Sequence, residues 1–451
     1  MKFTEGYWCI KKEITPLYAV EYADSRRNDN ELIVYAPGKH IADRGDCLNL
    51  GMLTIRLTSP MEDVIRVSVR HFDGTVCRGP FARIYGTSPH TVVEETDEEI
   101  RYRSGRTTAV IDKRPNSWGI HFLDGDRELT STGYRNMAHM TNRETGKCYM
   151  VEQLALDVDE YVYGLGERYT PFIKNGQSVE MWNEDGGTAS EITYKNIPFY
   201  ITNKGYGVLL ENEGDAAYEI ASEKVERIQF SVEGERLDYC VINGSTPKGT
   251  ISKYTELTGR PALPPAWLTP SFTTNYDETT TSGFIDGMAD RDIPLHVFHF
   301  DCYWMEAYEW CNFTWDPKTF PDPEGMLLRY HDRGLKICVW INPYIGQKSP
   351  LFEEGMRLGY LMKKTNGDVW QAGMGLVDFT NPGAVEWYQA KLKTLLDMGV
   401  DCFKTDFGER IPVKDIAYFD GSDPVKMHNY YTYLYNRAVF ELLERERGTG
   451  E

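Results

Sequence analysis

The stretch VDCFKTDFGERIP, residues 400–412, places Lys404 and Asp406 two positions apart at the end of an apolar run. Side chains at positions i and i+2 of a strand point to the same face, so these two would lie side by side, with Cys402 before them. A neighbouring ammonium favours the ionised carboxylate, which is the form that a nucleophile or an anionic clamp requires. A structural ion pair at a strand end is an equally good interpretation of the two residues taken alone.

The second half of the sequence alternates strand-like and helix-like runs after the proline-rich stretch RPALPPAW at 260–267. Apolar runs at 295–301, 335–342 and 375–380 predict strands, and those at 321–334, 382–399 and 425–446 predict helices, the first capped by Asp322 with Pro323 at its first position. Such alternation predicts a parallel sheet with right-handed crossovers.

Each of four predicted strands ends in polar or aromatic residues: Asp301, Trp340 followed by Asn342, Asp378, and Lys404 with Asp406. Ligands bind at the carboxyl ends of parallel strands. We therefore expect a pocket at the top of a (β/α)8 barrel, of which about half of the eight units are present.

The first half of the sequence has a different pattern. Short runs of β-formers, several with period two, recur between turn residues at 31–35, 53–58, 64–72, 106–112, 197–202 and 228–232. The fold class expected is an N-terminal antiparallel β-sandwich, residues 1–245, followed by a partial (β/α)8 TIM-type barrel, residues 246–451, with an inserted excursion around 343–374.

Composition excludes several classes of partner. The chain of 451 residues carries a net charge of −19, which argues against nucleic acid and anionic membranes. The start has no apolar signal region and no run is long enough to cross a bilayer, so we expect a cytoplasmic protein. The nine cysteines form no CxxC pair and are expected to be reduced, mostly buried thiols. HExxH, P-loop and GxGxxG patterns are absent, so we expect no metal and no cofactor.

Several stretches closely resemble glycoside hydrolase family 31, in particular its bacterial α-xylosidases. They include VYGLGERYTPFIKNGQSVEMWNEDGGT at 162–188, YKNIPFYITNKGYGVLL at 194–210, SFTTNYDE at 271–278, LHVFHFDCYWM at 295–305, FTWDPKTFPDPEGM at 313–326, LKICVWINPYIGQKSP at 335–350 and KTDFGE at 404–409. The resemblance implies a galactose-mutarotase-like β-sandwich on a catalytic barrel that hydrolyses α-linked sugars with retention of configuration.

The resemblance also implies roles for the charged residues. Asp406 corresponds to the nucleophile that forms a glycosyl-enzyme. Lys404 corresponds to a residue that binds a sugar hydroxyl beside the nucleophile, and Asp301 to a carboxylate that accepts hydrogen bonds from sugar hydroxyls. Further pocket residues are implied: the aromatic walls Trp340, Phe407, Phe272 and Trp370, and Asp185 at the pocket rim. Without the motifs, each aromatic is more often a core residue and Asp185 a turn residue.

Sugar selectivity is implied by the two residues after Asp301. Family α-glucosidases tend to carry Ile-Asp there and α-xylosidases Cys-Phe, and this sequence has Cys302 and Tyr303. Xylose lacks the hydroxymethyl arm of glucose, so a bulky aromatic can fill that space. The resemblance therefore predicts release of α-linked xylose from the non-reducing ends of oligosaccharides. The alternatives are an α-glucosidase of the same family and a non-catalytic carbohydrate-binding or assembly module.

The sequence departs from the family pattern at three places. Only LTP, residues 268–270, separates PPAW from SFTTNY, and a proline in so short a link argues against a normal central strand. A second shortening follows Trp370. A retaining glycosidase needs a second carboxyl group as acid/base. In the family this group lies beyond the position that corresponds to residue 451, so we assign no acid/base residue. We expect the given sequence to be part of a longer sequence or to contain gaps. Family members commonly form oligomers, so we also expect self-association.

Overall fold

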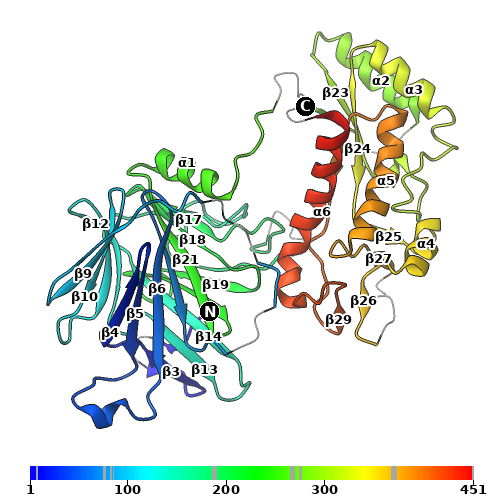
Figure 1. Cartoon of the computed structure of the whole chain (residues 1–451). Coiled ribbons are helices and arrows are strands. Elements are labelled where there is room, and N and C mark those ends of the chain that lie inside the picture. Colours follow the sequence, from blue (N-terminus) through cyan, green and yellow to red (C-terminus); the bar gives the residue numbers. More distant parts are fainter. Residues whose placement is uncertain are drawn as a thin grey trace. The chain divides into compact units, whose positions relative to one another are not determined.

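The computed structural model describes residues 1–6, 9–74, 78–81, 84, 86–184, 190–264, 270–273, 277–366 and 373–448. The chain divides into an N-terminal unit, Met1–Cys77 with Phe81–Pro261, and a C-terminal unit, Arg78–Pro80 with Ala262–Glu451 (Figure 1). Two predicted site residues, Asp185 and Trp370, lie outside the described residues.

The largest sheet of the N-terminal unit has eight strands in the order β15-β17-β18-β21-β7-β6-β5-β4. Every neighbouring pair in it is antiparallel. Its strands are β4 Asp24–Asn28, β5 Glu31–Pro37, β6 Met52–Met61, β7 Val64–Arg70, β15 Val162–Gly164, β17 Phe199–Thr202, β18 Tyr206–Leu210 and β21 Arg236–Asn243.

Two further antiparallel sheets complete this unit, apart from the short pair β1 Thr4–Glu5 and β2 Cys9–Ile10. The order in the second sheet is β16-β19-β20-β14-β13-β3, and in the third it is β12-β11-β10-β9-β8. The second sheet contains β3 Ile14–Tyr18, β13 Ala138–Asn142, β14 Cys148–Ala155, β16 Gln177–Glu180, β19 Ala216–Ile220 and β20 Arg227–Glu233. The third contains β8 Val92–Glu95, β9 Glu99–Ser104, β10 Thr107–Asp112, β11 Gly119–Asp124 and β12 Arg127–Gly133.

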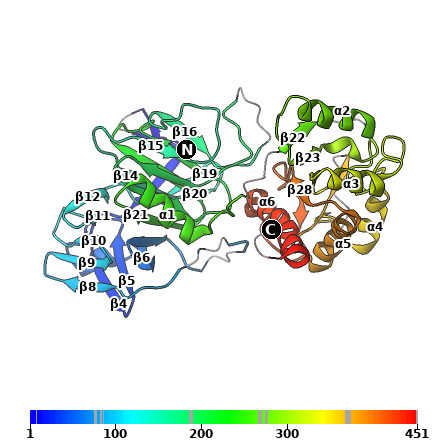
Figure 2. The ribbon, with the colours of Figure 1, turned by 90° about the horizontal axis from the view of Figure 1, so that it is seen from above.

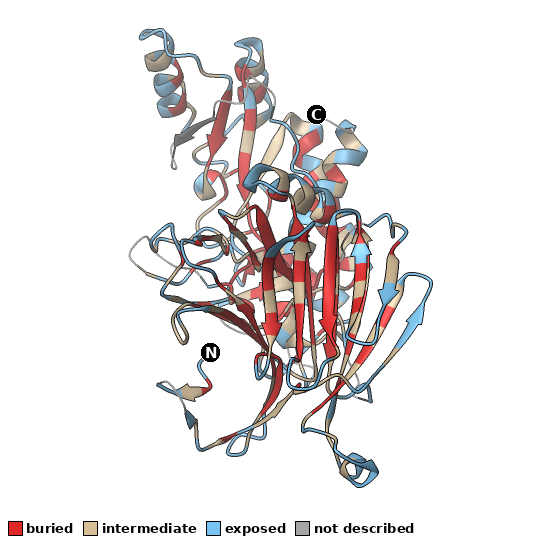
Figure 3. Ribbon diagram, turned by 90° about the vertical axis from the view of Figure 1, so that its left-hand side faces the viewer, coloured by how far each residue is buried: buried red, intermediate tan, exposed pale blue. Residues whose placement is uncertain are grey.

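Residues from all three sheets share one apolar core. The period-two pattern produces this arrangement: in β6 every second side chain is buried and the others are partly exposed. Figure 3 shows burial concentrated in the central strands, with exposed residues in the outer strands and connections. The predicted antiparallel β-sandwich is therefore confirmed. The short helix η1, Arg44–Cys47, connects β5 and β6.

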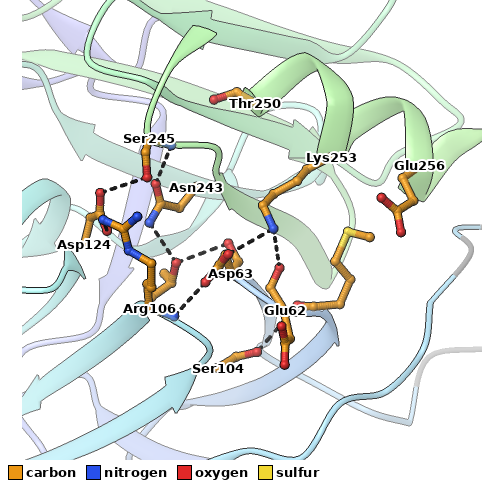
Figure 4. A network of polar contacts seen from close by, with 12 residues as sticks. Glu62, Asp63, Ser104, Arg106, Asp124, Asn243, Ser245, Thr250, Lys253 and Glu256 are labelled. Carbon is orange, nitrogen blue, oxygen red and sulfur yellow. Dashed lines mark hydrogen bonds and ion pairs between the residues drawn. The ribbon is translucent and has the colours of Figure 1, made fainter. Parts of the chain in front are cut away.

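Helix α1, Pro247–Thr258, belongs to the N-terminal unit, so the predicted boundary at residue 245 is wrong. Lys253 Nζ lies 3.0 Å from Asp63 Oδ2 and donates to the Glu62 carbonyl, both in the β6–β7 turn. Asp63 Oδ1 in turn accepts from the Arg106 amide at 2.6 Å. Figure 4 shows this network, which fixes α1 to two strand turns and moves the division to Pro261.

Four parallel strands form the centre of the C-terminal unit in the order β22-β23-β24-β28. Figure 2 shows the helices of this unit around the outside of these strands. The strands are β22 Pro270–Thr273, β23 Val297–Phe300, β24 Lys336–Ile341 and β28 Cys402–Thr405. The helices are α2 Glu278–Ala289, η2 Cys302–Trp304, α3 Pro323–Asp332, α4 Pro350–Leu358, α5 Pro382–Met398 and α6 Pro424–Arg447. The predicted helices and three predicted strands are confirmed, and the unit forms part of a (β/α) barrel.

Helices α3, α5 and α6 begin in the same way, with an Asp or Asn N-cap followed by proline. The predicted cap Asp322 accepts a hydrogen bond from the Gly325 amide at 3.1 Å. Asn381 and Asp423 cap α5 and α6 by the same type of bond. These caps fix where each crossover helix starts after its strand.

Two strand predictions for this unit are wrong. The run at 375–380 is not a strand of the parallel sheet, because only β27, Met374–Leu376, is extended there and it pairs antiparallel with β25, Tyr344–Gly346. These two strands and α4 form the predicted excursion, and β26, Lys363–Lys364, pairs with β29, Ile416–Ala417. Conversely, β22 does form a strand next to β23. Pro270 is its first residue, one of the strand positions at which proline is tolerated.

The described cysteines are all free thiols, but only Cys240 and Cys311 are buried, so the prediction of mostly buried thiols is wrong. Within the described residues, no helix combines the length and the apolar character needed to cross a membrane.

Candidate active site

One face of the parallel sheet collects the predicted polar residues, because the strand register aligns them in layers. His299, Cys338 and Cys402 are register partners on β23, β24 and β28. Two residues further along the strands, Trp340 and Lys404 are also register partners. Positions two apart share a face, so the order along β28 is Cys402, Lys404 and then Asp406 just past the strand.

Asp406 lies at the carboxyl end of β28 with a hydrogen-bond donor on each carboxylate oxygen. The indole Nε1 of Trp340 donates to Oδ2 at 2.6 Å, and the amide of Phe407 donates to Oδ1 at 3.0 Å. Its own amide donates to the Ile341 carbonyl at 2.9 Å, which continues the pairing with β24. The carboxylate is therefore fixed in orientation, yet its side chain is 40% exposed and open to a substrate.

Lys404 connects the two predicted carboxylates. Its Nζ lies 3.3 Å from Asp301 Oδ2 and 3.7 Å from Asp406 Oδ2. Asp301 directly follows β23 and caps η2, where its Oδ1 accepts from the Cys302 amide at 2.9 Å. The Lys404 ammonium offsets one of the two negative charges and repels any further cation placed between the carboxylates. The structure therefore brings Asp301, Lys404 and Asp406 together, as the sequence predicted.

His299 lies beneath these charges, with Nε2 3.9 Å from Asp301 Oδ2. Burial, and next the Lys404 ammonium, lower the pKa of His299, although Asp301 and Asp406 act in the opposite direction. The imidazole is therefore neutral at neutral pH, and Lys404 supplies the positive charge beside the nucleophile candidate. The sequence analysis did not identify His299, whose only signal was its position two residues before Asp301.

Aromatic rings line the site next to Asp406. Trp340 is buried, and its ring meets that of Phe407 edge to face with centroids 6.1 Å apart. Phe407 is 41% exposed and has φ = 60°, a left-handed conformation that is rare for a bulky residue and marks local strain. This turn ends the strand and directs the Phe407 amide to Asp406. Trp340 and Phe407 thus lie beside Asp406, and their role as pocket walls stays a prediction.

Tyr344 is a site residue that the sequence analysis missed. Its ring stacks on Phe407 with centroids 5.9 Å apart, and its hydroxyl accepts a hydrogen bond from the Gly408 amide at 3.0 Å. It therefore supports the strained turn from β25. Its position four residues after Trp340, in the same quoted motif LKICVWINPYIGQKSP, was the available signal.

The predicted selectivity residues Cys302 and Tyr303 lie in η2, directly after Asp301. Tyr303 is 44% exposed, and its ring meets that of Trp310 edge to face at 5.8 Å. Trp310 is held in turn by donating to the Cys302 carbonyl at 3.2 Å. Burial and the neighbouring Asp301 raise the pKa of the Cys302 thiol to about 11, so it stays protonated.

Four predicted residues are not placed in the site. Asp378 instead accepts hydrogen bonds from Thr380 and from the Phe419 amide, and the described strand before it, β27, pairs with β25 and not with the parallel sheet. Phe272 is on β22 with its backbone paired to His299, but its side chain is outside the description. Asp185 and Trp370 lie outside the described residues.

Known proteins resemble this chain over most of its length. Residues 54–219 match the Glycosyl hydrolase 31 N-terminal galactose mutarotase-like domain, and residues 261–451 match the Glycosyl hydrolases family 31 TIM-barrel domain. The α-xylosidase XylQ of Lactiplantibacillus pentosus is 51% identical over 100% of this chain and 60% of its own length. An α-xylosidase of Emericella nidulans is 46% identical over 98% of this chain and 60% of its own length. The chain thus spans about 60% of the length of these relatives.

Solved structures share the fold at low sequence identity. A Listeria monocytogenes cycloalternan-forming enzyme in complex with a pentasaccharide matches with a TM-score of 0.83 at 22% identity, over 96% of this chain and 44% of its own. A family 31 α-xylosidase from a soil metagenome, complexed with xylose, matches with a TM-score of 0.77 at 18% identity, over 95% of this chain and 64% of its own.

Proposed function

Because this chain belongs to glycoside hydrolase family 31, we propose that the full-length protein is a retaining α-xylosidase that releases xylose from the non-reducing ends of α-xylosyl oligosaccharides. The observation that carries the proposal is the exposed Asp406 carboxylate, held between the Trp340 indole and the Lys404 ammonium at the carboxyl end of a barrel strand. The likeness to two α-xylosidases at about half identity supports the choice of sugar.

In the proposed reaction, Asp406 attacks the anomeric carbon of the xylosyl unit. The C–O bond to the leaving group breaks, the leaving oxygen takes a proton, and a covalent xylosyl-aspartate forms. Water then attacks the same carbon and releases the sugar with its original configuration. The donors on both oxygens of Asp406 orient the carboxylate before the reaction, which lowers the entropic part of the barrier.

Lys404 and Asp301 are proposed to orient the sugar. An ammonium donates to a ring hydroxyl and a carboxylate accepts from one, and charge-assisted hydrogen bonds of both kinds are stronger than neutral ones. The Lys404 ammonium and the Asp301 carboxylate lie 3.3 Å apart, so two neighbouring hydroxyls of one sugar ring can contact both groups at once. Asp301 is mostly buried and carries the fixed orientation of a helix cap.

Tyr303 is proposed to favour xylose over glucose. Its ring, braced by Trp310, would occupy the space that the hydroxymethyl arm of glucose needs. A second acidic residue at this position would instead accept from the extra hydroxyl of glucose. Neither the acid/base nor the contacts to the leaving group are assigned to residues of this chain.

The experiment that tests the function compares hydrolysis of aryl α-xyloside and aryl α-glucoside by the full-length protein. We expect a higher kcat/KM for the xyloside, with release of α-xylose as the first product. A clear preference for the glucoside would favour an α-glucosidase, and saturable sugar binding without turnover would reduce the protein to a carbohydrate-binding module.

A further inference from the structure

The backbone turn that follows Asp406 has an unfavourable conformation. Phe407 has φ = 60° and Gly408 has φ = 101°, so two consecutive residues are left-handed directly after the nucleophile candidate. A glycine adopts such a conformation readily, whereas a bulky residue does not. Strained backbone of this kind persists only where the surrounding structure fixes it. The contacts that fix this turn therefore bear on how Asp406 is placed.

Gly408 is held by a side-chain hydroxyl on each of its backbone polar groups. Its amide donates to the hydroxyl of Tyr344 on β25 at 3.0 Å, and its carbonyl accepts from the hydroxyl of Thr432 on α6 at 2.9 Å. Among the residues that the structure describes, no backbone group pairs with either of them. Gly408 is buried, and a buried backbone group without a hydrogen bond is costly. The two hydroxyls therefore form a clamp on Gly408.

The backbone fixes Tyr344 independently of this turn. Its strand β25 pairs with β27, its carbonyl accepts from the Cys311 amide at 3.1 Å, and its amide donates to Asn342 Oδ1 at 3.0 Å. Burial, and next the charge of Glu409, raise the pKa of Tyr344 to about 12, so the hydroxyl stays neutral at neutral pH. The clamp thus begins from a fixed and uncharged hydroxyl.

Helix α6 holds the chain on both sides of Asp406. Thr405, the last residue of β28, donates to Asn436 Oδ1 at 2.7 Å, and Asn436 Nδ2 donates to the Thr432 carbonyl at 2.8 Å. Thr432 in turn donates to the Gly408 carbonyl. The residue before Asp406 and the turn after it are therefore tied to one turn of the same helix, which limits movement of the backbone that carries the carboxylate.

The clamp reaches the carboxylate through Phe407. The Phe407 amide, one residue before Gly408, donates to Asp406 Oδ1 at 3.0 Å. When a clamping hydroxyl is removed, the strained turn can relax, and this amide then moves relative to the carboxylate. A nucleophile must lie within about 3–3.5 Å of the atom that it attacks, and small displacements from that geometry cost rate.

We propose that Tyr344 and Thr432 are positioning residues that act through Gly408 to hold the Asp406 carboxylate in the geometry of attack. The inference rests on the proposed hydrolysis by Asp406. The clamp fixes the nucleophile and not the bound sugar, so its loss should lower kcat and kcat/KM by the same factor and leave KM almost unchanged.

Conservative variants of the full-length protein test the clamp. Tyr344→Phe and Thr432→Val each remove one hydroxyl and keep the shape of the side chain. Each should lower kcat on the preferred aryl α-glycoside by about 10-fold, and should slow labelling of Asp406 by a fluoroglycosyl reagent of the same sugar by the same factor. Thr432→Ser retains the hydroxyl and should keep most of the wild-type kcat.

Tyr330→Phe is the matched control. Tyr330, on α3, is also buried, and its hydroxyl lies 3.2 Å from Ser282 Oγ and 3.3 Å from the Glu278 carbonyl. This variant should lower Tm, as loss of a buried hydrogen bond does, and leave kcat unchanged. Hydrogen exchange provides a readout that needs no activity: the peptide containing Gly408 should exchange faster in Tyr344→Phe and Thr432→Val than in the control.

The kinetics distinguish two failures. If the unmodified protein hydrolyses no aryl α-glycoside, the proposed function is wrong, and the positioning role is wrong with it. If the unmodified protein is active, and folded Tyr344→Phe and Thr432→Val keep its kcat and its labelling rate, only the positioning role is wrong. A Thr432→Ser variant as slow as Thr432→Val would likewise contradict a role for the hydroxyl.

Discussion

Replacing Trp340 by phenylalanine tests how Asp406 is held. The change keeps an aromatic ring but removes the indole N–H that donates to Asp406 Oδ2 at 2.6 Å. A hydrogen bond to a charged group contributes about 1.5–3 kcal/mol. Since about 1.36 kcal/mol corresponds to a tenfold change in rate, kcat/KM should fall by about 10- to 150-fold if the bond is made fully in the transition state.

The assay is hydrolysis of aryl α-xyloside by full-length Trp340→Phe, with Trp387→Phe as the matched control. Trp387 is also buried, but it lies on α5 and contacts Tyr360 and Lys391. Both variants lose a buried indole, so both should lower Tm, and only Trp340→Phe should lose most of its kcat/KM. Equal activity losses in the two variants, or wild-type activity in Trp340→Phe, would refute a special role for the bond to Asp406.

Three further predictions use other parts of the chain. Lys404→Ala should lower kcat/KM by about 10-fold or more, because sugar contact and positioning are lost. The control Lys336→Ala removes an ammonium that pairs with Asp401 at 3.0 Å at the opposite strand end, and it should leave kcat/KM unchanged. Equal kinetics for both variants would exclude the proposed role of Lys404. Tyr303→Ala should raise the ratio of glucoside to xyloside kcat/KM by about 10-fold, and an unchanged ratio would remove Tyr303 from the selectivity site. Burial raises the pKa of Glu152 from 4.5 to about 7, so the stability that protonated Glu152 contributes is full below pH 4.5 and is lost as pH rises through 7. Denaturant unfolding should therefore show that the free energy of unfolding of wild type falls by up to about 3 kcal/mol relative to that of Glu152→Gln over this window. Parallel pH profiles for the two proteins would contradict this.

Hydrophobic periodicity was sufficient to predict most of the architecture. The period-two runs became the strands of the sandwich, and the alternating runs became β23, β24, β28 and the helices between them. Helix α2 has little local signal, because its sequence ETTTSGFIDGMA contains three threonines and two glycines with low helix propensity. That helix depends on its Asp277 cap and on burial of Ile285, and burial is a tertiary effect.

The wrong boundary at residue 245 has a similar cause. The helix α1 is retained by Lys253, whose partners Asp63 and Glu62 lie about 190 positions earlier, and no local pattern reveals such a contact. The run at 375–380 was wrongly predicted as a barrel strand, because a run of buried apolar residues has the same sequence pattern in a short antiparallel pair and in a central strand of a parallel sheet.

The candidate site was easier to predict than contacts between distant strands of the sandwich. Asp406 and Lys404 are neighbours on one strand, and family motifs surround Trp340 and Asp301, so local sequence carried the information. His71 and Glu235, by contrast, are 164 positions apart and make contact only because the sandwich folds. Local sequence patterns therefore carried no signal for that contact.

The central claim is that Asp406 is the nucleophile of a retaining α-xylosidase. The most direct measurement incubates the full-length protein with a mechanism-based fluoro-xylosyl reagent, digests it, and maps the labelled peptide by mass spectrometry. We predict a single covalent xylosyl adduct on Asp406, absent from Asp406→Ala, a variant that should keep its fold because this side chain is 40% exposed. A stable adduct on Asp301 or any other carboxylate, or labelling that persists in Asp406→Ala, would contradict the assignment.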